Sequence, residues 1–532
     1  MQRKWIVISG GVLSGIGKGI VSASIGRLLN ANYKVIPIKC DGYLNVDPGT
    51  MNPCEHGEVF VLEDGGEVDM DFGHYERFMN IDCKFSWNLT SGKVFRAVID
   101  KERQGKYLGQ TVQIIPHVVD EVMLQYKQIA KQENADICIV EIGGTIGDIE
   151  NQIFVEAVRQ LKREAGPENI VYIHLTYVPE LESVGEQKTK PTQQSAALLR
   201  QSGISPDIII GRSKKLLTKK SKHKIALFCN IDEASVISDP DTTTVYELPL
   251  IFQKEGLPQI IENKLSLKNT DNMQTWRKLV NRILNPGKQV TVAICGKYTD
   301  LHDSYVSIIE ALTHAGAHLN CKVNITWIET TEIEENNLEP SELLKGVQGV
   351  IIPGGFGSRG AEGKIKVIRY LRENNIPFLG LCFGLQLAVV EFARNVCKLA
   401  KANSTEVSPN TPYPVIFIMP EQLNIEEKGA TMRLGKQKAN LQKGTLVHRM
   451  YACETASERH RHRYEVNPLY HAILTSHGLV FSGISQGKKL VEYIELPSHK
   501  FFVGTQAHPE LKSSLEKPAP LFMGFVKACI KK

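Results

Sequence analysis

The residue best placed to do chemistry is a cysteine that stands between two glycines. Cys382 follows the apolar run 377–381, which predicts a short buried strand, and precedes a helical pattern over 385–393. Gly380 and Gly384 lie two residues to either side, which is the spacing of a nucleophile elbow, a sharp strand-to-helix turn that exposes its central side chain. The amides that begin the helix would then face an oxyanion. The motif alone leaves a second interpretation open, a buried structural cysteine.

A base for this thiol is available far downstream, in the run 504–510. A catalytic thiol needs a base, and the base needs an acceptor that orients it. His508 and Glu510 are spaced so that the carboxylate could hold the imidazole, although a His-Pro-Glu run is otherwise an ordinary loop. Together with Cys382 and the glycine-rich run 353–357, this pair resembles the class I glutamine amidotransferases, which release ammonia from glutamine through a thioester.

Length and composition predict a soluble protein of two domains. The 532 residues exceed what one compact core usually holds. The composition, 42% apolar and 23% charged, is typical of globular proteins. The formal charge of +5 argues against a dedicated nucleic-acid binder, and we expect the basic cluster 459–463 to pair with a carboxylate or a substrate instead.

The cysteines and the apolar runs exclude further classes. The 11 cysteines form no Cys-x-x-Cys pair, which argues against a zinc ribbon and a disulfide scaffold. No apolar run reaches about 18 residues, so no membrane span is expected. The apolar stretch near the start is too short for a signal peptide and reads as a first strand. We therefore expect a cytoplasmic protein.

A glycine-rich turn near the start has the features of a phosphate-binding loop. An expected strand at 5–9 opens onto the run 10–19, and a helix is expected from 20 to about 30. Backbone amides and a helix N-terminus bind anions, and Lys18 adds a positive charge. Gly19 stands where a P-loop has the Ser or Thr that binds magnesium, so metal ligands must come from elsewhere. The alternative is a tight βα turn without a ligand.

Carboxylates that could bind this metal follow in the chain. Glu141 ends an apolar run that predicts a buried strand, and in open α/β sheets ligands bind at the carboxyl ends of strands. Carboxylate oxygens suit Mg²⁺. Asp71 lies in a charged stretch between apolar residues. A solvated charge is the alternative for Glu141, and an exposed loop acid is the alternative for Asp71.

Strand and helix patterns alternate along the first half, which predicts a doubly wound, mostly parallel sheet. Strands are expected at 34–39, 171–176, 208–211 and 224–229, with a helix at 153–162. The run 188–193 places two lysines before a helix that opens at Pro191, a second candidate anion site or a solvated basic loop. A linking helix is expected at 276–284, and a fresh α/β pattern begins at 290. We expect a first domain at 1–268, a linker at 269–288 and a second domain at 289–532.

Six runs, 10–19, 43–51, 56–61, 73–78, 141–150 and 188–193, together resemble the CTP synthase family, from residue 1 to about 530. The resemblance implies a ligase that makes CTP, ADP, phosphate and glutamate from UTP, ATP and glutamine, the final step of de novo CTP synthesis. It also implies Mg²⁺ with the ATP, CTP as a feedback inhibitor, GTP as an activator, and a homotetramer that could form filaments. Neither nucleic acid nor a membrane is expected as a partner.

The resemblance also assigns roles to residues of this sequence. Catalytic residues would be Cys382, His508, Glu510, Lys18 and Lys39. ATP would contact Gly15, Ile16, Gly17, Lys18, Gly19, Ile20, Asp71, Asp239, Pro240 and Asp241. UTP, or CTP in competition with it, would contact Ser14, Asp148, Ile149, Glu150, Lys188, Thr189, Lys190, Pro191, Thr192, Gln193 and Lys224. Glutamine would contact Gly355, Phe383, Gly384, Leu385, Gln386, Glu406 and Arg463. Asp71 and Glu141 would bind the metal.

The expected reaction has two halves. Phosphoryl transfer from ATP to O4 of UTP creates a leaving group that ammonia displaces. Ammonia is mostly protonated at neutral pH, so a sequestered path between the two sites is implied, with His56 as a candidate along it. Two rival interpretations stay open: another glutamine-dependent ligase, such as a cobyrinate amidase, and a non-catalytic assembly protein.

Overall fold

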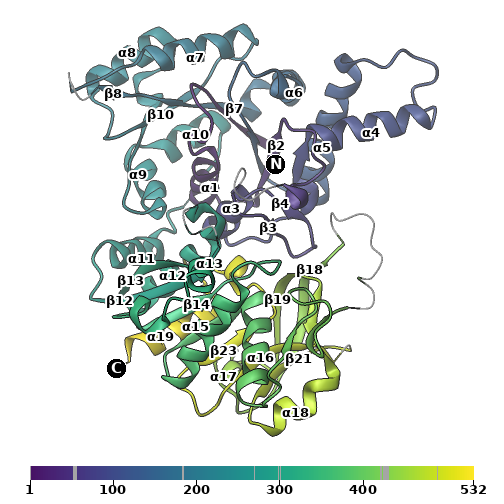
Figure 1. The fold of residues 1–532 in the computed structure, drawn as a ribbon. Coiled ribbons are helices and arrows are strands. Elements are labelled where there is room, and N and C mark those ends of the chain that lie inside the picture. The colour runs from purple at the N-terminus through teal and green to yellow at the C-terminus, as the bar shows by residue number, and fades with distance from the viewer. Residues whose placement is uncertain are drawn as a thin grey trace. The chain divides into compact units, whose positions relative to one another are not determined.

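The computed structural model describes residues 2–51, 57–181, 185–268, 270–297, 299, 301–419, 422, 431–487 and 489–531 (Figure 1). The chain packs into two compact units. The first holds Met1–Pro48 and His74–Val280, and the second holds Gly49–Gly73 and Asn281–Lys532. Both are α/β units, as expected from the sequence, and each is built on a central sheet that contains parallel strands.

The first unit is built on a seven-stranded sheet in which all neighbouring strands are parallel. In spatial order its strands are β11 (Val236–Pro240), β10 (Ile208–Ser213), β7 (Ile170–Tyr177), β1 (Lys4–Gly10), β6 (Ile137–Ile142), β2 (Val35–Asp41) and β5 (Asn88–Thr90). Nearly every strand residue is buried, which fits the continuous apolar runs of strands covered on both faces. A small hairpin, β8 (Glu180–Leu181) with β9 (Glu186–Gln187), lies outside this sheet.

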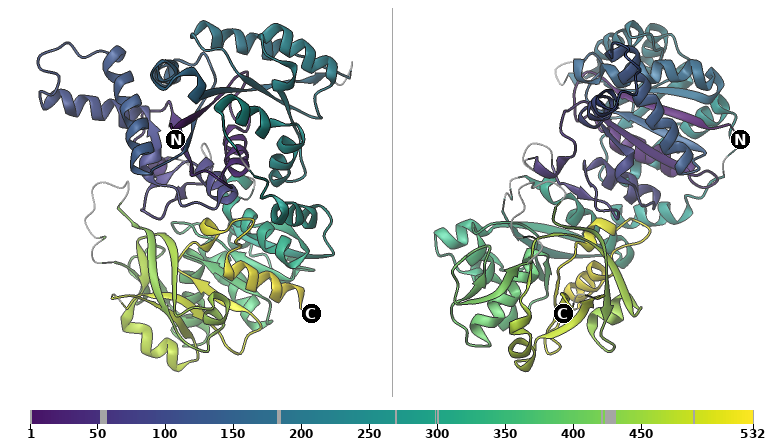
Figure 2. Two further views of the ribbon diagram at one scale, coloured as in Figure 1. Left: turned by 180° about the vertical axis from the view of Figure 1, so that it is seen from behind. Right: turned by 90° about the vertical axis from the view of Figure 1, so that its right-hand side faces the viewer.

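Helices lie on both sides of this sheet (Figure 2). They are α1 (Lys18–Leu29), α4 (Ser91–Arg103), α5 (Val119–Gln132), α6 (Gln152–Ala165), α7 (Lys190–Gln201), α8 (Lys219–Cys229), α9 (Leu248–Lys254) and α10 (Leu257–Leu265). Two more helices, α3 (Asp71–Met79) and α11 (Gln274–Leu284), cross the limits of the unit. Figure 1 shows α4 and the loop after it projecting away from the sheet.

One expected strand is wrong, because residues 224–229 form the second half of helix α8. Thr218 caps this helix by accepting a hydrogen bond from the Ser221 amide at 3.1 Å. Ile225, Ala226 and Cys229 are buried, while Leu227 and Phe228 between them are exposed. This one-sided burial has helical spacing. The short apolar run was ambiguous between strand and helix when read without the lysine-rich turn before it.

The second unit is built on a nine-stranded sheet that is parallel in one half and antiparallel in the other. Its order is β13 (Cys321–Glu329), β12 (Lys288–Gly296), β14 (Gly349–Ile352), β15 (Phe378–Leu381), β23 (Phe502–Thr505), β22 (Val491–Glu495), β21 (Val480–Ser485), β18 (Arg433–Leu441) and β19 (Thr455–His462). Two further sheets in this unit are formed by β16 (Ala402–Ser404), β17 (Tyr413–Ile418) and β20 (Tyr464–Val466), and by β3 (Phe60–Val61) and β4 (Glu67–Val68).

Two apolar cores pack in this unit. Its helices are α12 (Val306–Leu319), α13 (Thr330–Glu335), α14 (Pro340–Leu343), α15 (Ala361–Glu373), α16 (Phe383–Asn395), α17 (Leu446–Tyr451), α18 (His471–Ser476) and α19 (Pro520–Ile530). α16 is buried along almost its whole length, so the segment that follows Cys382 is held rigidly.

The segment Gly49–Gly73 packs with this second unit although it lies early in the sequence. The Arg459 guanidinium donates to the Val61 carbonyl at 3.1 Å, and Glu63 forms an ion pair with Lys512 at 2.7 Å. Glu67 forms an ion pair with Arg461, also at 2.7 Å. The early hairpin of β3 and β4 is therefore anchored to the strand that carries the basic cluster 459–463.

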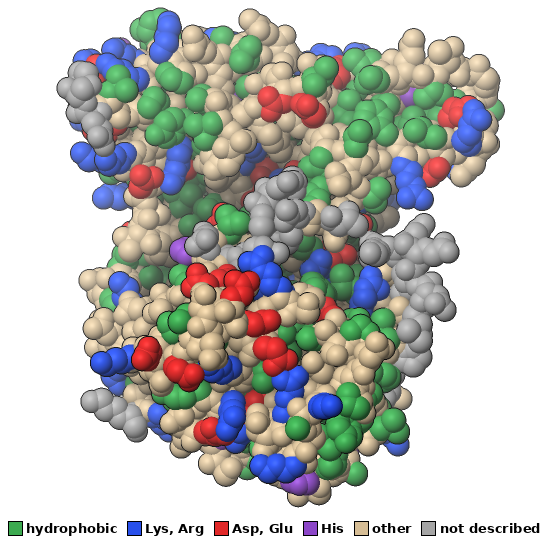
Figure 3. Space-filling model, viewed as in Figure 1, with side chains coloured by type: hydrophobic (Ala, Val, Ile, Leu, Met, Phe, Trp, Pro, Cys, Tyr) green, Lys and Arg blue, Asp and Glu red, His purple; other side chains and the backbone are tan. Residues whose placement is uncertain are grey.

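Lys and Arg side chains intermingle with Asp and Glu over the face of the second unit drawn in Figure 3. Among the described residues, no helix is both long and apolar enough to cross a membrane.

Candidate functional site

Cys382 lies at the turn between β15 and α16, where the sequence predicted a nucleophile elbow. Its backbone has φ 49° and ψ −100°, a strained conformation that non-glycine residues adopt mainly at functional sites. A hydrogen bond of 2.7 Å from its amide to the Thr505 carbonyl holds the turn. A Cβ on Gly384 would lie 2.2 Å from the Ile352 carbonyl oxygen, so the turn has no room for a side chain there.

His508 and Glu510 follow β23 and reach the same turn. His508 Nδ1 lies 2.8 Å from Glu510 Oε1, and the His508 amide donates to the Arg459 carbonyl at 2.8 Å. Burial alone would lower the pKa of His508, but the negative charges of Glu510 and Cys382 outweigh burial and raise that pKa to about 10. The imidazole is therefore protonated at neutral pH.

The three residues face a cavity of about 340 Å³ in the second unit. Gly354 and Gly355 form part of its wall, and a Cβ on Gly354 would lie 2.9 Å from His508 Cε1. The cavity is large enough for an amino acid. Other residues of its wall are Glu58, Val59, Val61, Lys297, Phe356, Lys364 and Arg461.

Lys364 is a wall residue that the sequence interpretation missed. Its side chain is almost fully buried, at 1% exposure, and its ammonium lies 5.3 Å from the centre of the Phe383 ring. Burial, aided by the charge of Lys297, lowers the pKa of Lys364 to about 8. Its position three residues after the buried Ala361 and one before the buried Ile365 places it on the inner face of α15. Helical periodicity could have revealed it.

The other expected glutamine contacts do not form part of this wall as far as the described residues define it. Glu406 accepts a hydrogen bond from the Gly357 amide at 2.7 Å, and burial raises its pKa. Arg463 donates to Gln422 and Thr431. Leu385 packs in the core, so only its backbone is available to a ligand. The side chain of Gln386 is also buried.

The phosphate-loop candidate has the expected form in the first unit. Gly15 and Gly17 have positive φ angles of 69° and 98°, and Gly17 caps the start of α1. Lys18, the first residue of α1, donates from Nζ to the Gly144 carbonyl at 2.6 Å. Ile16 is buried, whereas Ser14 is exposed. The turn therefore offers backbone amides and one cation to an anion.

Glu141 lies near the carboxyl end of β6, as expected, and is 1% exposed. Its Oε2 accepts hydrogen bonds from Ser22 Oγ at 2.5 Å and from Tyr75 hydroxyl at 2.7 Å. Lys39 is its neighbour in the β2–β6 register and forms an ion pair with Asp41 at 3.0 Å. The candidate phosphoryl-transfer residues of the first unit thus converge at one end of the sheet.

Asp71, the second metal candidate, begins α3, the helix that carries Tyr75, and belongs to the second unit. The described residues contain no group of three His, Cys, Asp or Glu side chains that could hold a metal by themselves. Each of these two residues is a carboxylate, the donor type that Mg²⁺ usually binds together with substrate phosphates. The donor chemistry therefore fits magnesium bound with a nucleotide.

The expected UTP contacts fall into separate places of the first unit. Asp148, Ile149 and Glu150 line a cavity of about 620 Å³. The run 188–193 lies at the start of α7 and is not in that wall as described. Within it, Lys188 pairs with Glu186 at 2.8 Å. Lys224 is exposed on α8.

Asp239, Pro240 and Asp241 lie at and just beyond the end of β11, and Arg212 holds both carboxylates. The guanidinium lies 3.0 Å from Asp239 and 2.9 Å from Asp241. Burial raises the pKa of Asp239 to about 6, against the lowering effect of Arg212. The sequence interpretation missed Arg212, because an arginine within a strand carries no local signal of its partner.

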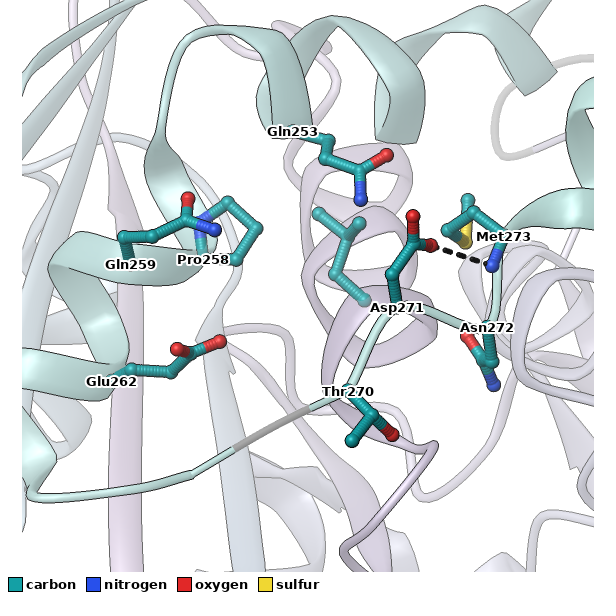
Figure 4. A pocket seen from close by; sticks show the side chains of 9 residues that line it. Gln253, Pro258, Gln259, Glu262, Thr270, Asp271, Asn272 and Met273 are labelled. Carbon is teal, nitrogen blue, oxygen red and sulfur yellow. Dashed lines mark hydrogen bonds between the residues drawn. The ribbon is translucent and has the colours of Figure 1, made fainter.

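A smaller cavity in the first unit contains none of the expected site residues (Figure 4). It measures about 70 Å³ and is lined by Leu28 of α1 and by residues of α9, α10 and the segment before α11. Asp271 accepts a hydrogen bond from the Met273 amide at 2.8 Å and pairs with Arg277 at 2.5 Å. These structural roles account for its carboxylate, and we assign the cavity no function.

Comparisons with known proteins cover both units. The family described as CTP synthase N-terminus matches residues 4–267, and the family described as glutamine amidotransferase class-I matches residues 300–528. The chain is 52% identical to CTP synthase of Archaeoglobus fulgidus over 529 residues, 99% of this chain and 98% of that protein. It is 53% identical to CTP synthase of Pyrococcus abyssi over 530 residues, with 99% and 98% covered.

Among solved structures, the chain is similar to the glutaminase domain of Trypanosoma brucei CTPS with bound acivicin. The two are 35% identical, with a TM-score of 0.43, and the match covers 46% of this chain and 94% of that one.

Proposed function

The chain belongs to the CTP synthase family, whose members are glutamine-hydrolysing, ATP-dependent ligases that aminate UTP to CTP. We propose which residues of this chain carry out glutamine hydrolysis and which carry out UTP activation. The observation that carries the proposal is the arrangement of Cys382, His508 and Glu510 around one cavity.

For glutamine hydrolysis we assign the nucleophile to Cys382. Its thiolate attacks the side-chain amide carbon of glutamine, and protonated His508 gives its proton to the departing nitrogen, so ammonia leaves and a thioester remains. His508 then takes a proton from the water that hydrolyses the thioester, while Glu510 holds the ring in place. The Gly355 and Phe383 amides are the candidate oxyanion donors. Gly384, Leu385, Gln386, Glu406 and Arg463 stay candidates for binding the rest of glutamine.

For UTP activation we assign the phosphate loop. The loop of Gly15 to Ile20 and Lys18 would hold the ATP phosphates, with Lys39 near the transferring phosphoryl group. Asp71 and Glu141 would hold Mg²⁺, which supplies charge neutralisation when bound. Asp239 to Asp241 would lie near the adenine. Ser14, Asp148 to Glu150, Lys188 to Gln193 and Lys224 would bind UTP, or CTP in its place. O4 of UTP would accept the γ-phosphoryl group, and ammonia would displace phosphate from C4.

The remaining assignments extend this proposal. We expect a synthase domain at 1–268, a linker at 269–288 and an amidotransferase domain at 289–532. Released ammonia would pass to the UTP site without entering bulk water, because free ammonia protonates at neutral pH. His56, the candidate along that path, lies outside the described residues. We further propose a cytoplasmic homotetramer, able to form filaments, that CTP inhibits and GTP activates.

The test is detection of CTP from UTP, ATP and Mg²⁺ with either glutamine or ammonium as nitrogen source. Cys382→Ala should abolish the glutamine route and keep the ammonium route, because each half-reaction has its own residues. Lys18→Ala should lose CTP synthesis from both sources. Glutamine use that persists in Cys382→Ala would refute the assignment of the nucleophile, and a full ammonium-driven rate in Lys18→Ala would refute its phosphate role.

A further inference from the structure

Gln506 is a buried side chain in the second unit that touches the reacting sulfur. It directly follows β23 and is 0% exposed. Its backbone amide donates to the Glu492 carbonyl at 2.8 Å, which fixes the main chain. Its side-chain nitrogen Nε2 lies 3.5 Å from Cys382 Sγ. The residue stands two positions before His508, in a run that the sequence interpretation used only for its histidine and carboxylate.

The direction of this amide follows from a chain of hydrogen bonds that begins at a backbone carbonyl. The Tyr464 carbonyl lies 3.0 Å from Gln386 Nε2, and a carbonyl oxygen only accepts. The NH₂ group of Gln386 must therefore point to Tyr464. The same NH₂ group lies 3.3 Å from Gln506 Oε1. Gln506 thus accepts from Gln386 through its oxygen, and its own NH₂ group is left facing Cys382.

The carbonyl that starts this chain is itself held in place. His462 Nδ1 lies 3.1 Å from the same Tyr464 oxygen, and His462 is buried. Burial, with the charges of Arg433 and His508, keeps the pKa of His462 well below its ordinary value. A neutral His462 that donates from Nδ1 fits a carbonyl acceptor. Reversal of either glutamine amide would bring two acceptors or two donors together.

We infer that Gln506 is a catalytic residue of glutamine hydrolysis that donates a hydrogen bond to the Cys382 thiolate, and that Gln386 and the Tyr464 carbonyl set its direction. The inference rests on the proposed role of Cys382 as nucleophile. Hydrogen bonds to ionised acceptors are stronger than those to neutral ones, so this donor favours the thiolate over the thiol. It acts again when the C–S bond of the thioester breaks and the electron pair returns to sulfur.

Other groups around the sulfur define what Gln506 adds. His508 and Glu510 face it from the segment after β23, and Lys364 of α15 lies in the same cavity wall. The Arg461 carbonyl of β19 lies 3.8 Å from Sγ and can accept only from the thiol form. The positive charges of His508 and Lys364 favour the thiolate from a distance. The Glu510 carboxylate and the Arg461 carbonyl oppose it. Gln506 differs from all four because it is a neutral donor that contacts the sulfur directly.

The experiment measures the reactivity of Cys382 towards iodoacetamide, followed by mass spectrometry of its peptide over about pH 5 to 10. Gln506→Met keeps the length of the side chain and removes its donor. We expect the pH of half-maximal alkylation to rise by about one unit, which is an approximately tenfold lower rate on the acid side, since the variant no longer donates a hydrogen bond to the charged form of the sulfur. Glutamine-dependent CTP synthesis should fall while ammonium-driven synthesis is retained.

Controls separate this role from structural damage. Gln437→Met makes the same change in the same unit, at a side chain that donates to the Leu434 carbonyl at 3.2 Å, and should leave the profile unchanged. Gln386→Met should shift the profile in the same direction as Gln506→Met but less. If Gln506→Met loses ammonium-driven synthesis too, a second variant, Gln506→Glu, replaces it in the test. This variant keeps the size of the side chain and places a negative charge at the sulfur. We expect it to raise the pH of half-maximal alkylation of Cys382 even further.

An unchanged alkylation profile in a Gln506 variant that still makes CTP from ammonium would overturn the proposal. An unchanged profile in Gln386→Met would overturn the orienting role of Gln386. The proposed function fails in a different way, through glutamine use that persists in Cys382→Ala, so the two failures are distinguishable.

Discussion

The contact between Glu510 and His508 gives a prediction whose size follows from the structure. The two side chains are 2.8 Å apart, and His508 has its pKa raised from 6.5 to about 10. One pKa unit corresponds to about 1.4 kcal/mol, so the whole change is worth about 5 kcal/mol, shared between Glu510 and Cys382. Glu510→Gln removes the charge and keeps the shape. We expect it to cost about 1.5–3 kcal/mol, the range for a hydrogen bond to a charged group.

Two consequences follow from the sign of this shift. Glutamine-dependent turnover should fall roughly 10- to 100-fold at neutral pH, because His508 loses the proton that pairs with the thiolate, while ammonium-driven synthesis is retained. His508 has a folded-state pKa above its ordinary value, so its protonation stabilises the fold fully below about pH 6.5 and less and less as the pH rises to about 10. The stability lost in Glu510→Gln should therefore be largest near pH 6 and shrink towards pH 10.

The assay compares urea midpoints of wild type and Glu510→Gln at about pH 6, 8 and 9.5, together with both rates of CTP synthesis. Glu454→Gln serves as the matched control, because its ion pair with Lys443 at 2.9 Å is exposed and should matter little. A difference in midpoint that is equal at all three pH values would contradict the reasoning. So would a glutamine-dependent rate that Glu510→Gln leaves intact.

Two further predictions test other parts of the site. Arg212→Met removes the guanidinium that holds Asp239 and Asp241 at the end of β11. We therefore expect KM for ATP to rise about tenfold in ammonium-driven synthesis. An unchanged KM would argue against nucleotide binding at the end of β11. Gly354→Ala places a Cβ about 2.9 Å from His508 Cε1, so the imidazole ring must shift. We expect glutamine-dependent turnover to fall about 100-fold while ammonium-driven synthesis is retained. An unchanged glutamine-dependent rate would contradict this expectation.

The elements that local sequence determines were predicted well. Residues 5–9 and 137–141 form the strands β1 and β6, and the glycine-rich turn with Lys18 begins α1. The same holds for Cys382 between β15 and α16. Each of these features combines a short apolar run with a glycine turn, and both signals act within about ten residues. The prediction of a strand at 224–229 was wrong because a short apolar run alone does not distinguish a buried strand from half of an amphipathic helix.

Partners that are distant in the sequence were not predictable in the same way. Arg212, Lys364 and Gln506 carry no local signal of the groups they meet. Gln506 is an instructive case, since its neighbours Gln386 and Cys382 lie 120 and 124 residues away. The sequence indicated that a base was needed for the thiol, and so selected His508. It contained no comparable requirement for a neutral donor at the sulfur, which only the packed arrangement reveals.

The segment Gly49–Gly73 is a further example of a partner that is distant in the sequence, because it contributes residues to the wall around Cys382. One family match ends at residue 267 and the other begins at residue 300, yet Glu58, Val59 and Val61 form part of the wall around Cys382. Glu67 pairs with Arg461, whose carbonyl lies near the sulfur. A buried thiolate depends on the charges and the dryness of its surroundings. Residues from the early segment Gly49–Gly73 therefore form part of the surroundings of Cys382, although more than 300 residues separate them from it in the sequence.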